Sequence, residues 1–218
     1  MSAVVNPLSR TQIAERLARD IPEGWYVNLG IGIPTLVAEY VPSDREVIFH
    51  SENGILGMGP PPAADHIDPW LVNAGKEHVT LRAGGAFFHH ADSFAMIRGG
   101  HLDLSVLGAF EVSQGGDIAN WTRPETETAP AVGGAMDLAV GAKRLWVVME
   151  HTTKDGQPRV VRRCSYPLTA VGVVHRVYTN LAVLDVAPRG FHVVEMISGL
   201  TLESLQARTD ARLFPTPP

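Results

Sequence analysis

The stretch WYVNLGIGIPTLVAEYV, residues 25–41, indicates the fold class. Residues 25–29 form a β-type run, a glycine-rich loop follows, and residues 36–41 are typical of a helix. A strand, a glycine loop and a helix in this order point backbone N–H groups at an anion. Gly30 and Gly32 either permit a tight turn only, or also let a ligand lie close to the backbone. The loop is not the dinucleotide-binding fingerprint, because Thr35 occupies the third glycine position.

A single carboxylate follows the next predicted strand. Glu52 comes just after a strand-like run at residues 46–50, and the chain then turns through Asn53-Gly54, two residues that tolerate positive φ. The simplest interpretation of Glu52 is a solvated acid in a turn. In open parallel sheets, however, ligands bind outside the carboxyl ends of the strands, and the Gly30 loop follows such an end too. Two candidate loops on one rim favour a functional role for Glu52.

The remaining pattern predicts one α/β domain over residues 1–218. Ser9 and Gln12 form a capping box at the start of a first helix. Further helices are expected at 93–98 and 201–207, strands at 79–81, 101–107, 144–149, 160–161 and 177–186, and glycine-rich loops at 83–86 and 133–134. Hairpin signals replace βα alternation in the last third, which predicts antiparallel strands at the edge of a largely parallel, open sheet.

Composition limits the function classes. The chain has 218 residues and a net charge of -5, with no Lys/Arg-rich block, which argues against nucleic-acid binding. No apolar run reaches the about 18 residues of a membrane span, and we find no signal-peptide pattern. A single cysteine excludes an intramolecular disulfide and suits a reducing compartment, so a cytoplasmic location is expected. His89, His90, Asp92 and His101 lack the spacing of metal ligands, so no metal site is expected.

Six segments, in order along nearly the whole chain, resemble the B subunit of family I (3-oxoacid) CoA-transferases. They are GIGIP at 30–34, HSENG at 50–54, SFAMIRGGH at 93–101, GGAMDL at 133–138, EHTTKDG at 150–156 and CSYPLT at 164–169. The resemblance implies a single-domain, three-layer α/β/α sandwich that moves CoA between succinate and 3-oxo acids. It also implies an A subunit as partner in an A2B2 hetero-oligomer. CoA would be a substrate and a covalent intermediate, with no permanently bound cofactor.

The same resemblance assigns roles to the loops. Glu52 would be the nucleophile, Gly133 and Gly134 would help form the oxyanion hole, and Gly30, Gly32, Asn53 and Gly54 would belong to the substrate and CoA loops. Asn53 is either an orienting neighbour of Glu52 or only a turn residue. Because the nucleophile must be ionised at neutral pH, the pKa of Glu52 is expected not to be raised as that of a general acid would be.

Two branches of the family differ in their acceptor. Acetoacetate-type members carry Lys-Gly ahead of the GGAMDL segment, whereas Pro130-Ala131-Val132 stands here. Together with GAFFHHAD at 85–92, this resembles the 3-oxoadipate type, which takes CoA from succinyl-CoA and serves aromatic-compound degradation through the β-ketoadipate route. The distal carboxylate of 3-oxoadipate needs a basic or donor-rich group, and Arg82, Arg98 and Arg123 are candidates.

The alternatives are an acetoacetate CoA-transferase, a sugar-phosphate isomerase or deaminase on a related fold, and a non-catalytic interaction subunit.

Overall fold

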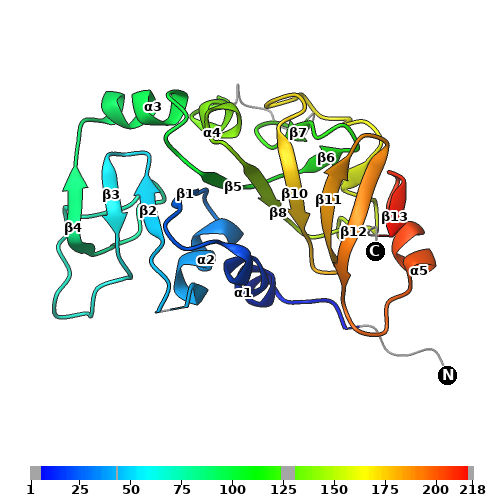
Figure 1. The fold of residues 1–218 in the computed structure, drawn as a ribbon, viewed down its shortest axis with the longest axis horizontal. Helices are drawn as coiled ribbons and strands as arrows, with labels where there is room; N and C mark the ends of the chain where they lie inside the picture. The colour runs from blue at the N-terminus through cyan, green and yellow to red at the C-terminus, as the bar shows by residue number, and fades with distance from the viewer. Residues whose placement is uncertain (1–5, 43, 124–130, 216–218) are drawn as a thin grey trace.

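The computed structural model describes residues 6–42, 44–123 and 131–215, and one ten-stranded sheet runs through them (Figure 1). The strand order is β13-β12-β11-β10-β8-β5-β1-β2-β3-β4. The five central strands are mutually parallel: β10 (Val174–Tyr178), β8 (Leu145–Val148), β5 (Leu104–Gly108), β1 (Tyr26–Leu29) and β2 (Ile48–Ser51). The expected open α/β sheet is therefore confirmed.

Antiparallel pairs flank this parallel centre on both sides. On one side β11 (Ala182–Ala187) and β12 (Gly190–Met196) form the predicted C-terminal extension, with β13 (Leu213–Pro215) parallel to β12 at the edge. On the other side β3 (Ile55–Met58) and β4 (Leu81–Phe87) add a second antiparallel edge, which was not predicted from the sequence. The Glu52 turn thus connects the last parallel strand, β2, to β3.

Helices cover both faces of the sheet, which makes three layers (Figure 1). Helices α1 (Arg10–Asp20) and α2 (Ile33–Tyr40) pack on one face, and α3 (His90–Arg98) and α4 (Ala135–Gly141) lie on the other. A small sheet of β7 (Ile118–Ala119), β6 (Glu111–Ser113) and β9 (Val160–Val161), together with α5 (Leu202–Gln206), also packs into the core beneath α4.

The central strands are buried on both faces, as parallel strands between two helical layers should be. In β8, Leu145 and Val147 belong to the core under α4, while Trp146 and Val148 belong to the core under α1 and α2. At the start of α1, Ser9 Oγ accepts from the Gln12 N–H at 3.2 Å, and Gln12 Oε1 accepts from the Ser9 N–H at 2.9 Å. The predicted capping box is therefore confirmed.

Two local predictions were wrong. The expected loop at 83–86 is part of β4, which pairs with β3 because glycines let the two strands approach closely: a Cβ on Gly57 would lie 2.9 Å from Gly85 Cα. The run at 177–186 is not one strand but the end of β10, a turn and most of β11. Thr179 Oγ1 accepts the N–H groups of Leu181 and Ala182 at 3.1 and 3.0 Å, a turn motif that competes with strand pairing.

The strand order reverses between β1 and β5. The chain runs from β1 to β2 on one side, and β5, β8 and β10 are added on the other. At such a switch point the connections leave toward opposite faces, and a crevice opens at the carboxyl ends of the strands. The Gly30 N–H donates to the Val106 carbonyl at 2.8 Å across this point.

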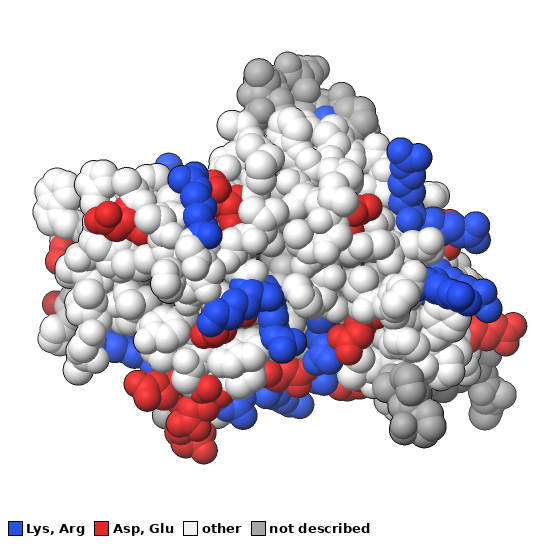
Figure 2. All heavy atoms as spheres, turned by 45° about the horizontal axis from the view of Figure 1, so that its top comes forward, with Lys and Arg blue, Asp and Glu red and all other residues white. Residues whose placement is uncertain are grey.

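The surface seen in Figure 2 carries scattered charges of both signs, and Lys and Arg do not gather there into one continuous stripe. Within the part of the chain that the structure describes, no helix combines the length and apolarity needed to cross a membrane. Pro130, used above to distinguish the two branches of the family, lies outside the described residues.

Candidate active site

A cavity of about 530 Å³ opens at the switch point of the sheet. Its walls include Gly30 and Ile31 after β1, Glu52 after β2, and the residues at the carboxyl ends of β5 and β8. Gly30 and Glu52, which were predicted to share one rim, therefore line the same cavity. Its size lies within the range of small-molecule sites, about 300–1,000 Å³.

Glu52 is half-buried in the tight turn between the antiparallel strands β2 and β3. The Gly54 N–H donates to the Ser51 carbonyl at 3.0 Å, and the Gly54 carbonyl accepts from the Phe88 N–H at 3.0 Å. Gly54 has a φ of 115°, and a Cβ there would overlap the Phe88 carbonyl oxygen. Only glycine fits this position, so the backbone itself aims the Glu52 carboxylate.

The Gly133-Gly134 pair lies next to Glu52. A small hollow is lined by Glu52, His90, Ala91, Phe94, Arg98, Gly133 and Gly134. A Cβ on Gly134 would lie 2.8 Å from Phe94 Cζ and 3.5 Å from Glu52 Oε1. Two segments that are far apart in the sequence thus meet at the carboxylate, and glycine lets the backbone of the second segment come close to it.

Burial raises the pKa of Glu52, and the nearby His90 lowers it in part. The expectation that the pKa of this carboxyl is not raised was therefore wrong. The physical reason is desolvation, which disfavours the charged form and which a sequence pattern does not reveal. A carboxylate with a raised pKa is more basic when it is ionised, and greater basicity favours nucleophilic attack.

A buried polar chain holds the strand that carries Glu52. Asn28 Nδ2 on β1 donates to His50 Nδ1 on β2 at 3.1 Å, so the His50 Nε2–H donates to Ser93 Oγ on α3 at 2.9 Å. Burial lowers the pKa of His50 to about 4, so its ring is neutral at physiological pH. These side-chain hydrogen bonds connect β1, β2 and α3. His50, the central residue, lies two positions before Glu52. The HSENG motif contains His50 but does not reveal this role, which depends on partners 22 and 43 positions away.

Other predicted loop residues are placed differently. The Asn53 side chain donates to the Val72 carbonyl at 2.7 Å and so ties the turn to the following loop. This favours the turn interpretation of Asn53 over an orienting role. Gly32 has a φ of 95° and precedes α2 as its N-cap.

The three candidate arginines occupy different places. Arg98, which lines the small hollow, forms a bidentate salt bridge with Asp137. Its Nε donates to Oδ1 at 2.8 Å and its Nη2 donates to Oδ2 at 3.1 Å. Arg82 lines a second cavity, and Arg123 lines the Glu52 cavity. Two further arginines that were not predicted from the sequence, Arg10 and Arg159, also line the Glu52 cavity. No motif marks them: Arg10 is the first residue of α1, and Arg159 immediately precedes β9.

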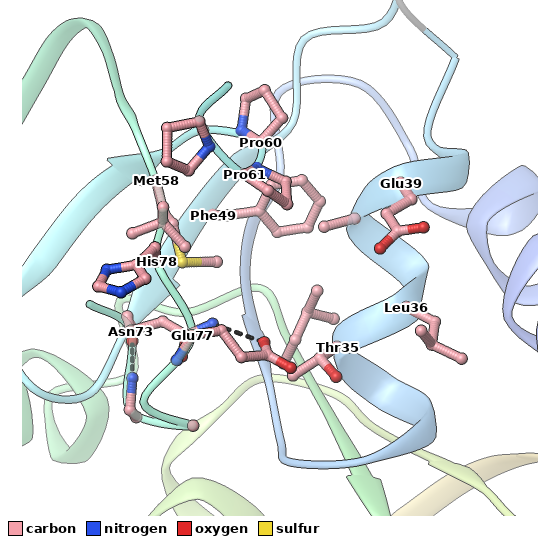
Figure 3. A pocket seen from close by; sticks show the side chains of 18 of the residues that line it. Thr35, Leu36, Glu39, Phe49, Met58, Pro60, Pro61, Asn73, Glu77 and His78 are labelled. Carbon is pink, nitrogen blue, oxygen red and sulfur yellow. Dashed lines mark hydrogen bonds between the residues drawn. The ribbon is translucent and has the colours of Figure 1, made fainter. Parts of the chain in front are cut away.

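A second cavity of about 490 Å³ adjoins the first and shares Leu29, Ile31 and Ala74 with it. Figure 3 shows this second cavity between α2 and the loop that carries Asn73 and Glu77. Asn73 Nδ2 donates to Glu77 Oε2, and the Glu77 N–H donates to Asn73 Oδ1, both at 3.0 Å. Apolar groups make much of the remaining wall, among them Phe49, Met58, Pro60, Pro61 and Val79.

The described residues contain no group of three or more His, Cys, Asp or Glu side chains that could hold a metal ion. His89 caps α3, because its Nδ1 accepts the Ala91 N–H at 3.1 Å.

Comparison with known proteins is consistent with this geometry. The coenzyme A transferase family model matches residues 10–207. The B subunit of the 3-oxoadipate CoA-transferase of Pseudomonas putida is 59% identical over 203 residues, which cover 93% of this chain and 95% of that protein. The B subunit of the succinyl-CoA:3-ketoacid coenzyme A transferase of Helicobacter pylori is 50% identical over 202 residues, 93% and 97% of the two chains.

Among solved structures, the acyl-CoA transferase YdiF apoenzyme from Escherichia coli O157:H7 has a similar fold, with a TM-score of 0.75 at 18% identity. The match covers 100% of this chain but 44% of that one, so this chain spans less than half of its length. The match of the family model over most of the sequence, with relatives above half identity, places this chain in the coenzyme A transferase family.

Proposed function

We propose that this chain is the catalytic B subunit of a 3-oxoadipate CoA-transferase, which moves CoA from succinyl-CoA to 3-oxoadipate through Glu52. One observation carries the proposal: the half-buried Glu52 carboxylate lies at the switch-point cavity, with the Gly133-Gly134 segment against it. Family membership and the name of the Pseudomonas putida relative support the reaction and the acceptor.

The first half-reaction loads CoA onto Glu52. A carboxylate oxygen of Glu52 attacks the thioester carbonyl of succinyl-CoA, and the C–S bond breaks to release CoA thiolate. The thiolate then attacks the Glu52 carbonyl of the resulting anhydride. This step forms a Glu52–CoA thioester and releases succinate, which leaves with the oxygen that had been on Glu52.

The second half-reaction runs the same steps in reverse with another acid. The C1 carboxylate of 3-oxoadipate attacks the Glu52 thioester and releases CoA thiolate, which then attacks the 3-oxoadipyl carbonyl of the new anhydride. 3-Oxoadipyl-CoA leaves, and Glu52 is again a carboxylate. CoA is therefore a substrate and a covalent intermediate, and the scheme uses no permanently bound cofactor.

A carboxylate is a weak nucleophile and an anhydride is a high-energy product, so the site must supply stabilisation. Orientation of bound reactants contributes up to about 7–11 kcal/mol in favourable systems. Each backbone donor aimed at a tetrahedral oxyanion contributes about 3–4 kcal/mol. We assign this donor role to Gly133 and Gly134, whose backbone lies beside Glu52. Gly30 and Gly32 form the loop on which the substrate lies.

The second cavity suits the pantetheine arm of CoA. The arm is long and weakly polar, and the cavity is largely apolar and shares a wall with the Glu52 cavity. Binding of this remote part of the substrate can offset the cost of forming the anhydride. We assign the remaining substrate contacts to an A subunit in an A2B2 assembly, in the reducing cytoplasm that the single cysteine suits.

Acetoacetate is the second candidate acceptor, because the Helicobacter pylori relative is named a 3-ketoacid enzyme. The two candidates share every step at Glu52, but acetoacetate is two carbons shorter than 3-oxoadipate and lacks the distal carboxylate. Side-by-side assays with both acids distinguish them.

The proposal is tested by trapping the intermediate. The chain, copurified with its partner subunit, is incubated with succinyl-CoA, reduced with borohydride and digested for mass spectrometry. The expected product is a peptide in which Glu52 has become the corresponding alcohol, or still carries CoA if reduction is omitted. An active preparation that yields no adduct on Glu52 would contradict the covalent mechanism.

Replacing Gly54 with Ala is expected to slow CoA transfer about 100-fold. The new Cβ overlaps the Phe88 carbonyl oxygen, so the turn must shift, and a displacement of about 1 Å at a reacting group costs roughly that much. Backbone strain also lowers the free energy of unfolding by about 1–3 kcal/mol. Steady-state rates and urea unfolding of the same samples measure the two effects.

Gly24→Ala is the matched control, because Gly24 also has a positive φ, 78°, but its added Cβ would meet no atom within 4 Å. This variant should lose stability and keep its transfer rate. Equal rates for the Gly54 and Gly24 variants would show that the turn does not position Glu52.

A further inference from the structure

We propose that Arg159, flanked by Arg123 and Arg10, binds the distal carboxylate of the dicarboxylate substrates while Glu52 reacts with their other end. All three arginines and Glu52 line the same switch-point cavity. The inference rests on the proposed function and names the groups that select dicarboxylates within it.

Arg159 is a half-buried cation held by neutral groups. Its Nε donates to the Phe110 carbonyl at 2.9 Å, and its Nη2 donates to the Ala109 carbonyl. Within the described ranges 6–42, 44–123 and 131–215, no carboxylate forms an ion pair with Arg159. Charged groups with this degree of burial are normally paired. A guanidinium that is fixed at the wall of a cavity, without such a partner, is a preformed site for an anion.

Like charges gather around Arg159. Burial lowers its pKa, Glu150 raises it, and Arg123 and Arg10 lower it further. Arg10 pairs with Glu150 at 3.2 Å, and the Arg123 guanidinium lies over the Phe110 ring, 4.3 Å from its centroid. The three cations repel one another, and a bound carboxylate offsets this repulsion. The cluster therefore favours anionic ligands.

The charge balance of the cavity changes during the reaction. Its described charged residues are the three arginines and two carboxylates, those of Glu52 and Glu150. Once Glu52 carries an acyl group or CoA, it is neutral, and the field of the arginines is opposed by Glu150 alone among these residues. The cavity is then most attractive to a dianionic acceptor at the stage when that acceptor must bind.

The dimensions agree with this assignment. The terminal carbons of extended 3-oxoadipate lie about 6 Å apart, from standard C–C bond lengths. A cavity of about 530 Å³ that is lined by both Glu52 and the arginines is large enough for such a molecule. Two backbone carbonyls hold Arg159 in place at the cavity wall, where it can meet the distal carboxylate of either dicarboxylate.

The test compares two acceptors that differ only at the far end. The enzyme–CoA thioester of the purified complex is challenged with 3-oxoadipate or with 3-oxohexanoate, which has a methyl group in place of the distal carboxylate. The ratio of the two second-order rate constants is measured for wild type, Arg159→Gln, Arg159→Lys and Arg123→Gln. Arg189→Gln is the control, because Arg189 lies in the turn between β11 and β12, at the end of the sheet away from the carboxyl ends of the parallel strands.

We expect Arg159→Gln to lower the preference for 3-oxoadipate about 10- to 100-fold, as the loss of a charged hydrogen bond does. Arg123→Gln should have a smaller effect, Arg159→Lys should keep part of the preference, and Arg189→Gln should keep all of it. A structural defect would slow both acceptors equally, so an unchanged ratio in Arg159→Gln would overturn the inference.

A second arm separates the distal carboxylate from the CoA phosphates. Thioester formation by Arg159→Gln is measured with succinyl-CoA and with acetoacetyl-CoA. Slower loading from succinyl-CoA alone supports the inference, whereas an equal loss with both donors would mean that the arginines bind the CoA phosphates instead. Failure of the proposed function looks different, because wild type itself would then form no Glu52–CoA thioester.

Discussion

Glu52→Gln is expected to lower the rate of CoA transfer by about 10⁴-fold or more, the scale seen when a covalent nucleophile is removed. An amide is too weak a nucleophile to form the anhydride, so both half-reactions stop. Glu52→Asp keeps the carboxylate but withdraws it by one methylene, about 1.5 Å, and should retain roughly one part in a hundred of the activity. Single-turnover assays of CoA release from succinyl-CoA, with the partner subunit present, measure both variants.

Stability measurements separate lost chemistry from lost structure. Because burial raises the pKa of Glu52, the folded chain holds this proton more tightly than the unfolded chain, and its contribution to stability falls as the pH rises through the folded pKa. At neutral pH, Glu52→Gln should therefore unfold at the same or a higher urea concentration than wild type. Glu46→Gln is the control. Glu46 lies six residues before Glu52, and this variant should keep its activity. Retention of CoA transfer by Glu52→Gln would refute the nucleophile assignment.

Acidification from about pH 7 to pH 4.5 is expected to remove several kcal/mol of stability. Burial lowers the pKa of His50 and of His151 to about 4, against about 6.5 in an unfolded chain. Each depressed pKa contributes stability that is complete above about pH 6.5 and is lost as the pH falls toward 4. The loss amounts to about 3 kcal/mol per histidine, a large share of a typical total of 5–15 kcal/mol.

The origin of this sensitivity lies in the burial of both rings, which disfavours the charged imidazolium. His151 bonds to Thr179 Oγ1 at 3.0 Å and to Thr209 Oγ1 at 2.8 Å, and His50 bonds to Asn28 and Ser93. Urea unfolding across this pH range measures how steeply the free energy of unfolding depends on pH, for wild type and for His50→Gln and His151→Gln.

Each single variant should be less stable at neutral pH but should show a flatter pH dependence. His66→Gln changes an exposed histidine and should leave the slope as it is. Carboxylates with lowered pKa, such as that of Asp20, act at lower pH and do not mimic the effect. Slopes that stay parallel in all variants would mean that the two buried histidines do not titrate as proposed.

Local signals predicted much of the fold. Strand, glycine loop and helix at residues 25–41 appear as β1 and α2, and Ser9 and Gln12 cap α1 as a capping box. These features depend on residues a few positions apart, so the sequence pattern contains them. The prediction failed where a local signal competes with pairing. The glycines at 84–85 are typical of a loop but lie in a strand, and Thr179 interrupts a run of apolar residues that is typical of one strand.

The sequence alone establishes that Glu52 lies on a turn after a strand, and that several segments of the chain supply glycine-rich loops. A turn needs only its own residues, because positive φ at Gly54 is a local property. The tertiary structure was needed to show which segments meet at Glu52, how far the carboxyl is buried, and that Arg159 lies in the same cavity. Those facts depend on the reversal of strand order between β1 and β5, which brings together residues more than 100 positions apart. Burial and charge in the assembled cavity arise from that packing, and they turn a solvated acid into a desolvated carboxylate that shares its cavity with three arginines.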